Sequence, residues 1–328
     1  MEKPKRVPAY ILTRDSGHSY DEVYSRVLAV TDQARRLYTD DTVSGMSLYK
    51  FMFHHACLLL QYMRLASHLE DSRYPSPLQR FFLSNLSCIN NDIMLPENQL
   101  PWLVIEALMT STEVDVDELI VAMGDSMGSN KYLSASSFDY VNMAPSDRPA
   151  HLLGLLRLHK QGMPVKPPDP LLFFVTSAPI SAKELEGIGI KLEHGKTDKF
   201  NDMEIKKGFL FDKLFLSPLN LDRIRASWLA SMVAFEVCYF VAVLVMLMVQ
   251  EEDVHMLWSK GFIRGELSDK EILKFFNGFA QQMSPGLRYF KILFVSHNTK
   301  ATTVLLSIIG VLLGIFKKIY SLKQHYKL

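Results

Sequence analysis

The stretch NNDIMLPENQLPWLVIEALM (residues 90–109) places three polar side chains between two apolar runs and follows them with a proline. Proline is favoured at the first position of a helix, because its missing N–H would have no partner there in any case. We therefore predict that Pro101 begins a helix. Glu97, Asn98 and Gln99 then form the turn and cap before it, since a carboxylate is favourable beside a helix N-terminus. An active-site loop is the competing interpretation, but a structural role in the turn is enough to explain all three side chains.

Helical patterns dominate the sequence around this stretch. Ser19 and Glu22 have capping-box spacing, and apolar residues follow at steps of four and three, which predicts an amphipathic helix over residues 20–38. The segment 46–69 is apolar around its circumference, so we expect a helix deep in the core. Residues 200–219 alternate apolar and polar positions around a Lys-Gly turn, which is typical of a short β-hairpin. The predicted fold class is mainly α with a minor β-hairpin element: one or more helical globular domains plus a C-terminal hydrophobic helix.

A proline-rich stretch indicates a division of the chain. Four prolines fall within residues 160–170, KQGMPVKPPDP, and this density is incompatible with a regular helix. Capping-box spacing then recurs at Ser181 with Glu184 and at Ser268 with Glu271, so the second half contains helices of its own. We expect an N-terminal helical half (1–159), a linker or long loop (160–180), a C-terminal half with the hairpin and helices (181–296), a candidate transmembrane helix (301–320) and a basic tail (321–328).

The quoted stretch resembles the most recognisable motif of the plant domain of unknown function 247 family (UPF0481-like). In that motif an aspartate and a leucine run lead into Glu-Asn-Gln, an aliphatic residue and proline. Further segments resemble the family in the same order: HHACLLLQYM (54–63), HLLGLLRL (151–158), SAKELEGIGIKL (181–192), ASMVAFEVC (230–238) and residues 251–279. The residues assigned to the family motifs are Glu97, Asn98, Gln99, Pro101 and Glu236. Members are mostly uncharacterised, and some in grasses are implicated in self-incompatibility as pollen-side determinants, so the resemblance implies recognition.

The chain departs from the family pattern at several places. His55 and Ala56 stand where Asp-Gly is usual, and Ala230 and Ser231 stand where Arg-Asn is usual. Residues 1–44 contain nothing similar to the Gly-Pro-Tyr-His segment with which members commonly begin. The resemblance therefore indicates a member that is shortened or divergent at its N-terminus.

Two apolar segments compete as a membrane span. Residues 228–250 are long enough but contain Glu236, and a carboxylate at the bilayer centre costs at least a few kcal/mol, about 2.5 or more. The resemblance places Glu236 in a helix of the folded domain, so we expect it to face the interior with a partner from another segment. Residues 301–316 are uncharged, and we predict that they anchor a single-pass membrane protein whose bulk is cytosolic, since no secretory signal precedes it. The residues assigned to this anchor are Thr302, Leu305, Ile308, Leu312 and Phe316.

The composition of the chain and the motifs that it lacks argue against several classes of function. The formal net charge is +1, so the summed charge gives no electrostatic footprint for nucleic acid. The three cysteines lack the spacing of zinc or redox motifs, which favours a reducing compartment. Neither a phosphate-binding loop nor a dinucleotide-binding motif occurs, and we expect no cofactor and identify no small-molecule substrate.

One catalytic alternative stays open. Gly124, Ser126 and Gly128 satisfy the G-x-S-x-G pattern of a serine hydrolase, but the preceding residues predict a helix where a nucleophile elbow needs a strand. We therefore expect Gly124 to end a helix and the Gly-Asp-Ser-Met-Gly segment to be a loop. The pair His54-His55 with Cys57 invites a metal site, yet no second motif completes it, so we expect no metal. The preferred function is recognition of an unidentified protein partner, not catalysis.

Overall fold

The computed structural model describes most of the chain in several ranges. These are residues 3–37, 45–67, 76–128 except 113, 138–162 except 141 and 145, 181–235 except 207, 209 and 210, and 239–282. Glu236 and the five residues assigned to the membrane anchor, Thr302, Leu305, Ile308, Leu312 and Phe316, lie outside these ranges, as do the segments 301–320 and 321–328.

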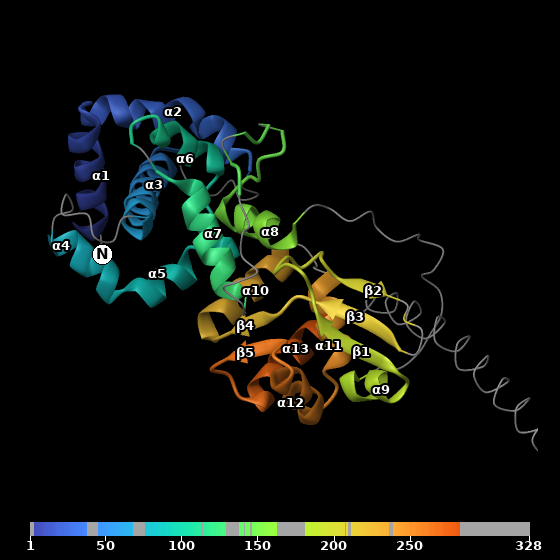
Figure 1. Ribbon diagram of the computed structural model, residues 1–328. Helices are drawn as coiled ribbons and strands as arrows, with labels where there is room; N and C mark the ends of the chain where they lie inside the picture. Colours follow the sequence, from blue (N-terminus) through green and yellow to red (C-terminus); the bar gives the residue numbers. More distant parts are fainter. Residues whose placement is uncertain are drawn as a thin grey trace, which may run out of the picture.

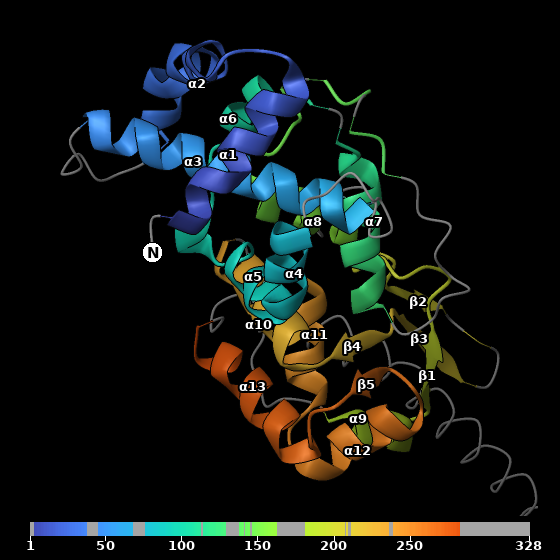
Figure 2. The ribbon, with the colours of Figure 1, turned by 90° about the vertical axis from the view of Figure 1, so that its left-hand side faces the viewer.

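The described residues are mainly helical, as predicted, and they form one elongated arrangement (Figures 1 and 2). The first helices gather at one end, the strands and last helices at the other, and α7 and α8 lie between them. The N-terminal helices are α1 (Lys3–Ser16), α2 (Tyr20–Arg35), α3 (Gly45–Ser67), α4 (Ser76–Ser84), α5 (Leu86–Asp92), the short 3-10 helix η1 (Pro96–Asn98), α6 (Trp102–Met109), α7 (Val116–Met127) and α8 (Leu152–Gln161).

Two of the predicted helices are confirmed with small differences. Helix α2 begins with the expected capping box, in which Ser19 and Glu22 bond each other's backbone N–H, and it ends at Arg35. Helix α3 is buried along most of its length, which follows from its apolar sequence. Lys50 and Phe51 are exposed, Phe51 to 50%, so α3 is not covered on every side.

The C-terminal half adds two small sheets among the described residues. Strands β2 (Glu204–Lys206) and β3 (Asp212–Leu216) pair antiparallel and confirm the predicted hairpin. The sequence patterns did not show that β1 (Ile190–His194) pairs parallel to β3, or that β4 (Leu219–Leu221) pairs parallel to β5 (Ile263–Gly265). The helices of this half are α9 (Ala182–Gly187), α10 (Arg223–Phe235), α11 (Tyr239–Leu247), α12 (Glu251–Ser259) and α13 (Asp269–Gln282).

A continuous hydrophobic core joins both halves. It extends from Ala9 in α1 to Phe279 in α13, and α7 and α8 contribute to it from the middle of the molecule. Helix α8 runs through Gln161, so Lys160 and Gln161 belong to a helix and not to the expected linker. The remainder of that linker, residues 163–180, lies outside the described ranges.

The longer of the two membrane candidates packs inside the protein. Its described residues lie in α10, in α11 and in the turn after α11, and Phe240 to Met248 are each at most 9% exposed within the core. In the part of the chain that the structure describes, no helix combines the length and the apolar character needed to cross a bilayer.

Candidate functional site

The Glu97-Asn98-Gln99 segment lies between α5 and α6 and is held by its own amide side chains. Asn98 Nδ2 donates to Asp92 O at 3.0 Å, and Gln99 Nε2 donates to Ile93 O at 2.7 Å and to Leu95 O at 2.9 Å. These acceptors are backbone carbonyls at the end of α5 and in the turn that follows. The amides therefore close the turn after α5, and the predicted turn is present.

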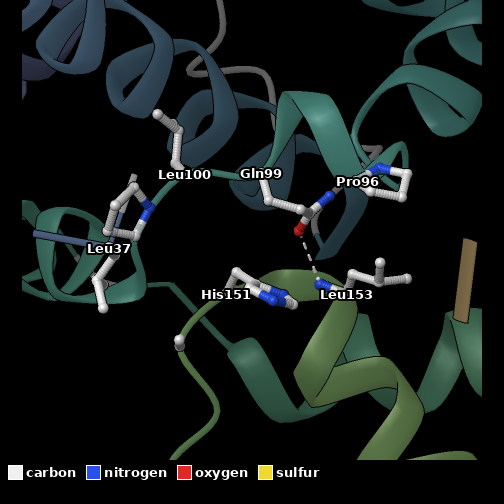
Figure 3. Close-up of a pocket in the computed structure, with 8 residues that line it drawn as sticks. Leu37, Pro96, Gln99, Leu100, His151 and Leu153 are labelled. Atoms are coloured by element: carbon white, nitrogen blue, oxygen red, sulfur yellow. Dashed lines mark hydrogen bonds between the residues drawn. The ribbon is translucent and has the colours of Figure 1, made fainter. Parts of the chain in front are cut away.

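Gln99 also reaches a helix that is far away in the sequence. Its Oε1 accepts a hydrogen bond from the Leu153 N–H at 2.9 Å, in the first turn of α8 (Figure 3). His151 Nδ1 accepts from the Gly154 N–H at 3.0 Å in the same turn. Two of the otherwise unpaired N–H groups at the start of α8 are thereby satisfied. The side chain of Gln99 thus caps α8, and not α6 as the sequence suggested.

The start of α6 also differs from the prediction by one residue. Pro101 is the N-cap, with φ −54° and ψ 126°, and Trp102 is the first helical residue. The Trp102 N–H donates to Ala150 O at 2.6 Å, so this first donor has a partner in the segment before α8. A proline one position later would have removed that bond.

A polar network fixes the segment before α8 against α6. The Tyr140 hydroxyl accepts from Trp102 Nε1 at 2.7 Å and donates to Glu106, and Arg148 pairs with the same carboxylate at 2.8 Å. Burial, with the Glu106 carboxylate beside it, raises the pKa of Tyr140 to about 12. The tyrosine therefore stays protonated and keeps its role as a donor. The network positions Ala150 and His151 opposite Gln99.

These elements enclose a pocket of about 330 Å³, which we call the Gln99 pocket (Figure 3). Burial lowers the pKa of His151, so its ring is neutral at pH 7 and its Nδ1 remains an acceptor. The walls are mostly apolar and suit an inserted apolar side chain. The pocket is lined by Leu37, Pro96, Gln99, Leu100, Pro101, Ala150, His151 and Leu153.

Glu97 differs from its two neighbours in this segment. Its side chain is exposed, and among the described residues no hydrogen bond or ion pair to its carboxylate is found. The expectation that Glu97 caps the following helix is therefore wrong, because η1 and Gln99 separate it from α6. Asn98 and Gln99 serve the fold, whereas the Glu97 carboxylate is available to an external group.

The Gly-Asp-Ser-Met-Gly segment does not form the expected loop. Gly124 and Ser126 lie within α7, and Gly128 is the C-cap, so the prediction that Gly124 ends the helix is wrong. A Cβ atom on Gly124 would lie 2.3 Å from His159 Cδ2, so glycine permits close packing of α7 against α8. The Ser126 hydroxyl donates to Met123 O at 2.7 Å. The strand-turn-helix geometry of a nucleophile elbow is absent at Ser126.

The histidines and cysteine considered for a metal site lie on α3. The His55 ring lies against Phe51 in a tilted arrangement, with ring centroids 3.9 Å apart. Cys57 is buried, which raises the pKa of its thiol well above the ordinary value. Within the described ranges, no group of three or more His, Cys, Asp or Glu side chains is placed to hold a metal ion.

Sequence reasoning missed a buried charge cluster at the C-terminal end of α8. Lys160 Nζ donates to Asp198 Oδ2 at 2.7 Å and to Asp198 O at 2.9 Å, and Lys160 is fully buried. Burial and the nearby Lys199 and Lys160 charges lower the pKa of His159 to about 3. Phe200 N–H donates to Lys160 O at 2.7 Å, so the same cluster fastens the loop before β2 to α8. Lys160 and Asp198 are 38 residues apart in the sequence, and no local sequence motif predicts their pairing.

A family model described as "Plant protein of unknown function" (DUF247) matches residues 1–304. The chain belongs to this family. A DUF247 relative in Arabidopsis thaliana, the UPF0481 protein At3g47200, is 23% identical over 290 residues, which cover 78% of this chain and 59% of the relative. The chain thus spans less than two thirds of the length of that relative. No solved structure gives a significant match. The family assignment confirms the resemblance drawn from the Glu-Asn-Gln motif.

Proposed function

We propose that this DUF247 protein acts by recognition, and that a protein partner docks on the surface formed by Glu97 and the rim of the Gln99 pocket. The observation that carries this proposal is the contrast within the motif. Asn98 and Gln99 are engaged in intramolecular hydrogen bonds, whereas the exposed Glu97 carboxylate has no partner among the described residues. No contact of the described fold uses this carboxylate.

The chemistry of the surface indicates what the partner presents. The Glu97 carboxylate would pair with a lysine or arginine side chain, and a bidentate arginine gives the stronger pair. Pro96 precedes Glu97 and lines the pocket, so an apolar side chain of the partner beside that basic residue can enter the apolar walls. Such a pocket with a polar rim is typical of the energetically dominant part of a protein interface.

The proposal is tested by comparing the intact chain with Glu97→Gln in proximity labelling in plant cells. The substitution removes the charge and keeps the size, and the exposed position of Glu97 means that folding should be unaffected. Glu266→Gln is the matched control, because Glu266 is also exposed and lies after β5 in the other half. We expect partners that Glu97→Gln loses and Glu266→Gln keeps. Identical partner sets for all three chains, at equal thermal stability, would refute the proposed surface.

We further propose that residues 301–320 tether the protein to a membrane. The support is the sequence, in which residues 301–316 carry no charge and lysines follow. Deleting residues 301–328 should move the protein from the carbonate-resistant membrane fraction to the soluble fraction. A truncated chain that still resists carbonate extraction would contradict the tether.

A pollen-side role in self-incompatibility is the concrete biology that the family resemblance offers. For this chain it is a proposal that rests on the resemblance, so the labelling experiment is best carried out in pollen as well as in leaf cells. Partners that depend on Glu97 and occur in pollen alone would support it. Labelling of the same partners in leaf cells would argue for a general recognition role instead.

A further inference from the structure

A second pocket, of about 560 Å³, lies between α3 and α5, and we call it the α3–α5 pocket. Both views place α5 beneath α3 (Figures 1 and 2). Its volume falls within the range of about 300–1,000 Å³ that is typical of small-molecule sites. The lining residues used below are Asn85, Cys88, Asp92, Asn98 and Trp102, together with apolar residues of α3, α5 and α6.

The walls of this pocket come from one face of each flanking helix. The α3 residues that line it follow helical spacing from His55 to Tyr62, and those of α5 do so from its N-cap Asn85 to Asp92. The Tyr62 hydroxyl donates to Asn90 Oδ1 and joins the two helices. Trp102 and Ile105 of α6 add an aromatic and an aliphatic surface. The pocket is therefore a largely apolar space that several elements hold open.

The polar groups in the lining leave acceptors unused. Asn85 Nδ2 donates to Phe81 O at 2.8 Å, and Asn98 Nδ2 donates to Asp92 O at 3.0 Å, whereas no bond to either side-chain oxygen is found among the described residues. The Asp92 carboxylate is exposed and has no ion pair or hydrogen bond within the described ranges.

The position of Asp92 makes this carboxylate unfavourable for the fold alone. Asp92 is the last residue of α5, where backbone carbonyls already concentrate negative partial charge. A free carboxylate at that end of a helix gains nothing from its surroundings. It is explained if an external cation completes the site.

We propose that the α3–α5 pocket binds a small organic cation, an amine with an aromatic or alkyl body. The body would fill the apolar walls beside Trp102, and the ammonium group would pair with Asp92 and donate to the unused oxygen of Asn98, whose amide bonds Asp92 O. The Asp92 carboxylate beside the Asn98 oxygen, in a lining whose described residues include no lysine or arginine, selects a donor with positive charge over a carboxylate or a neutral apolar molecule. The proposal stands apart from protein docking at Glu97, and either can fail without the other.

The test uses dansylcadaverine, a fluorescent amine with an aromatic body and a primary ammonium group, on the full chain. Binding is measured by energy transfer from tryptophan and by calorimetry. Asp92→Asn keeps the shape and removes the charge, and we expect it to weaken binding at least tenfold, because hydrogen bonds to charged groups are the strong ones. Asp21→Asn is the matched control, since Asp21 is an exposed carboxylate on α2 and should leave the affinity unchanged. A dansyl compound that ends in a hydroxyl should bind at least tenfold more weakly than the amine.

Alkylation of Cys88 locates the ligand independently. Cys88 is exposed and lines the pocket, whereas Cys57 is buried, so peptide mapping after maleimide treatment reports on Cys88 directly. Bound amine should slow modification of Cys88 in the wild-type chain and not in Asp92→Asn.

Four outcomes would overturn the assignment. The first is that the amine binds the wild-type chain and Asp92→Asn with equal affinity, and the second is that the hydroxyl compound binds the wild-type chain as tightly as the amine. The third is that bound amine does not slow the modification of Cys88. The fourth is that a basic helical peptide binds and the amine does not. The last would make the pocket a groove for a protein segment.

Discussion

Replacing Gln99 with alanine tests whether this side chain, and not Glu97, carries the structural role of the motif. Gln99→Ala removes three hydrogen bonds, of 2.7, 2.9 and 2.9 Å, to Ile93 O, Leu95 O and Leu153 N. Each is worth about 0.5–1.5 kcal/mol, and water can replace part of them because Gln99 is only partly buried. We therefore expect the free energy of unfolding to fall by about 2–3 kcal/mol.

The assay is urea unfolding followed by far-UV circular dichroism, with the slope m compared between variants so that a change in the unfolded ensemble is recognised. Glu97→Ala is the control, and it should change the free energy of unfolding by less than about 0.5 kcal/mol, as is usual for an exposed side chain without partners. The reasoning is refuted if Gln99→Ala lies within that range, or if Glu97→Ala destabilises as much as Gln99→Ala.

Three further predictions concern the contacts between α7, α8 and the loop before β2. Because the folded-state pKa of His159 is about 3, below its ordinary 6.5, the unfolded chain binds the extra proton. The free energy of unfolding should then fall by up to about 1.4 kcal/mol for each pH unit as the pH drops from about 6.5 towards 3. His159→Phe should reduce this dependence on pH when urea unfolding is measured at several pH values. Lys160→Met leaves the buried Asp198 carboxylate without its ion-pair partner and should lower the free energy of unfolding by about 3–5 kcal/mol. Adding Asp198→Leu to this variant should recover most of the lost stability. Equal stability of the single and the double variant would contradict the ion pair. Gly124→Ala should destabilise by about 1–3 kcal/mol in thermal unfolding because its Cβ meets the His159 ring, and an unchanged melting temperature would mean that α7 and α8 are not packed this closely.

Features that depend on neighbouring residues could be predicted from the sequence. The capping boxes at Ser19, Ser181 and Ser268 are all present, because a serine and a glutamate three residues later need only each other. The β2–β3 hairpin is likewise a pairing of adjacent segments.

Features that depend on distant residues could not be predicted. The Gln99 bond to α8 joins positions 54 residues apart, and an amide gives no sign of which backbone group it will meet. Strand β1 pairs parallel to β3, which needs a crossover that no turn motif marks. Gly124 looked like a helix end because glycine is common there, but close approach of His159 explains it instead. In each case the sequence does not show which distant residues the tertiary structure brings together.

The continuous core has a consequence for the connectivity of the chain. Helix α8 ends at Gln161 and α9 begins at Ala182, yet the Lys160–Asp198 pair and the bond from Asn201 N–H to Gln161 O join the parts on either side of that interval. These contacts and the shared core do not need a covalent link between the two parts. Two pieces that are divided within this interval and together keep every residue of the chain should assemble as a heterodimer whose melting temperature rises with concentration. Each piece alone would expose the apolar surface that the other covers and should aggregate, which makes the interval a natural place to divide the protein for a split-reporter assay.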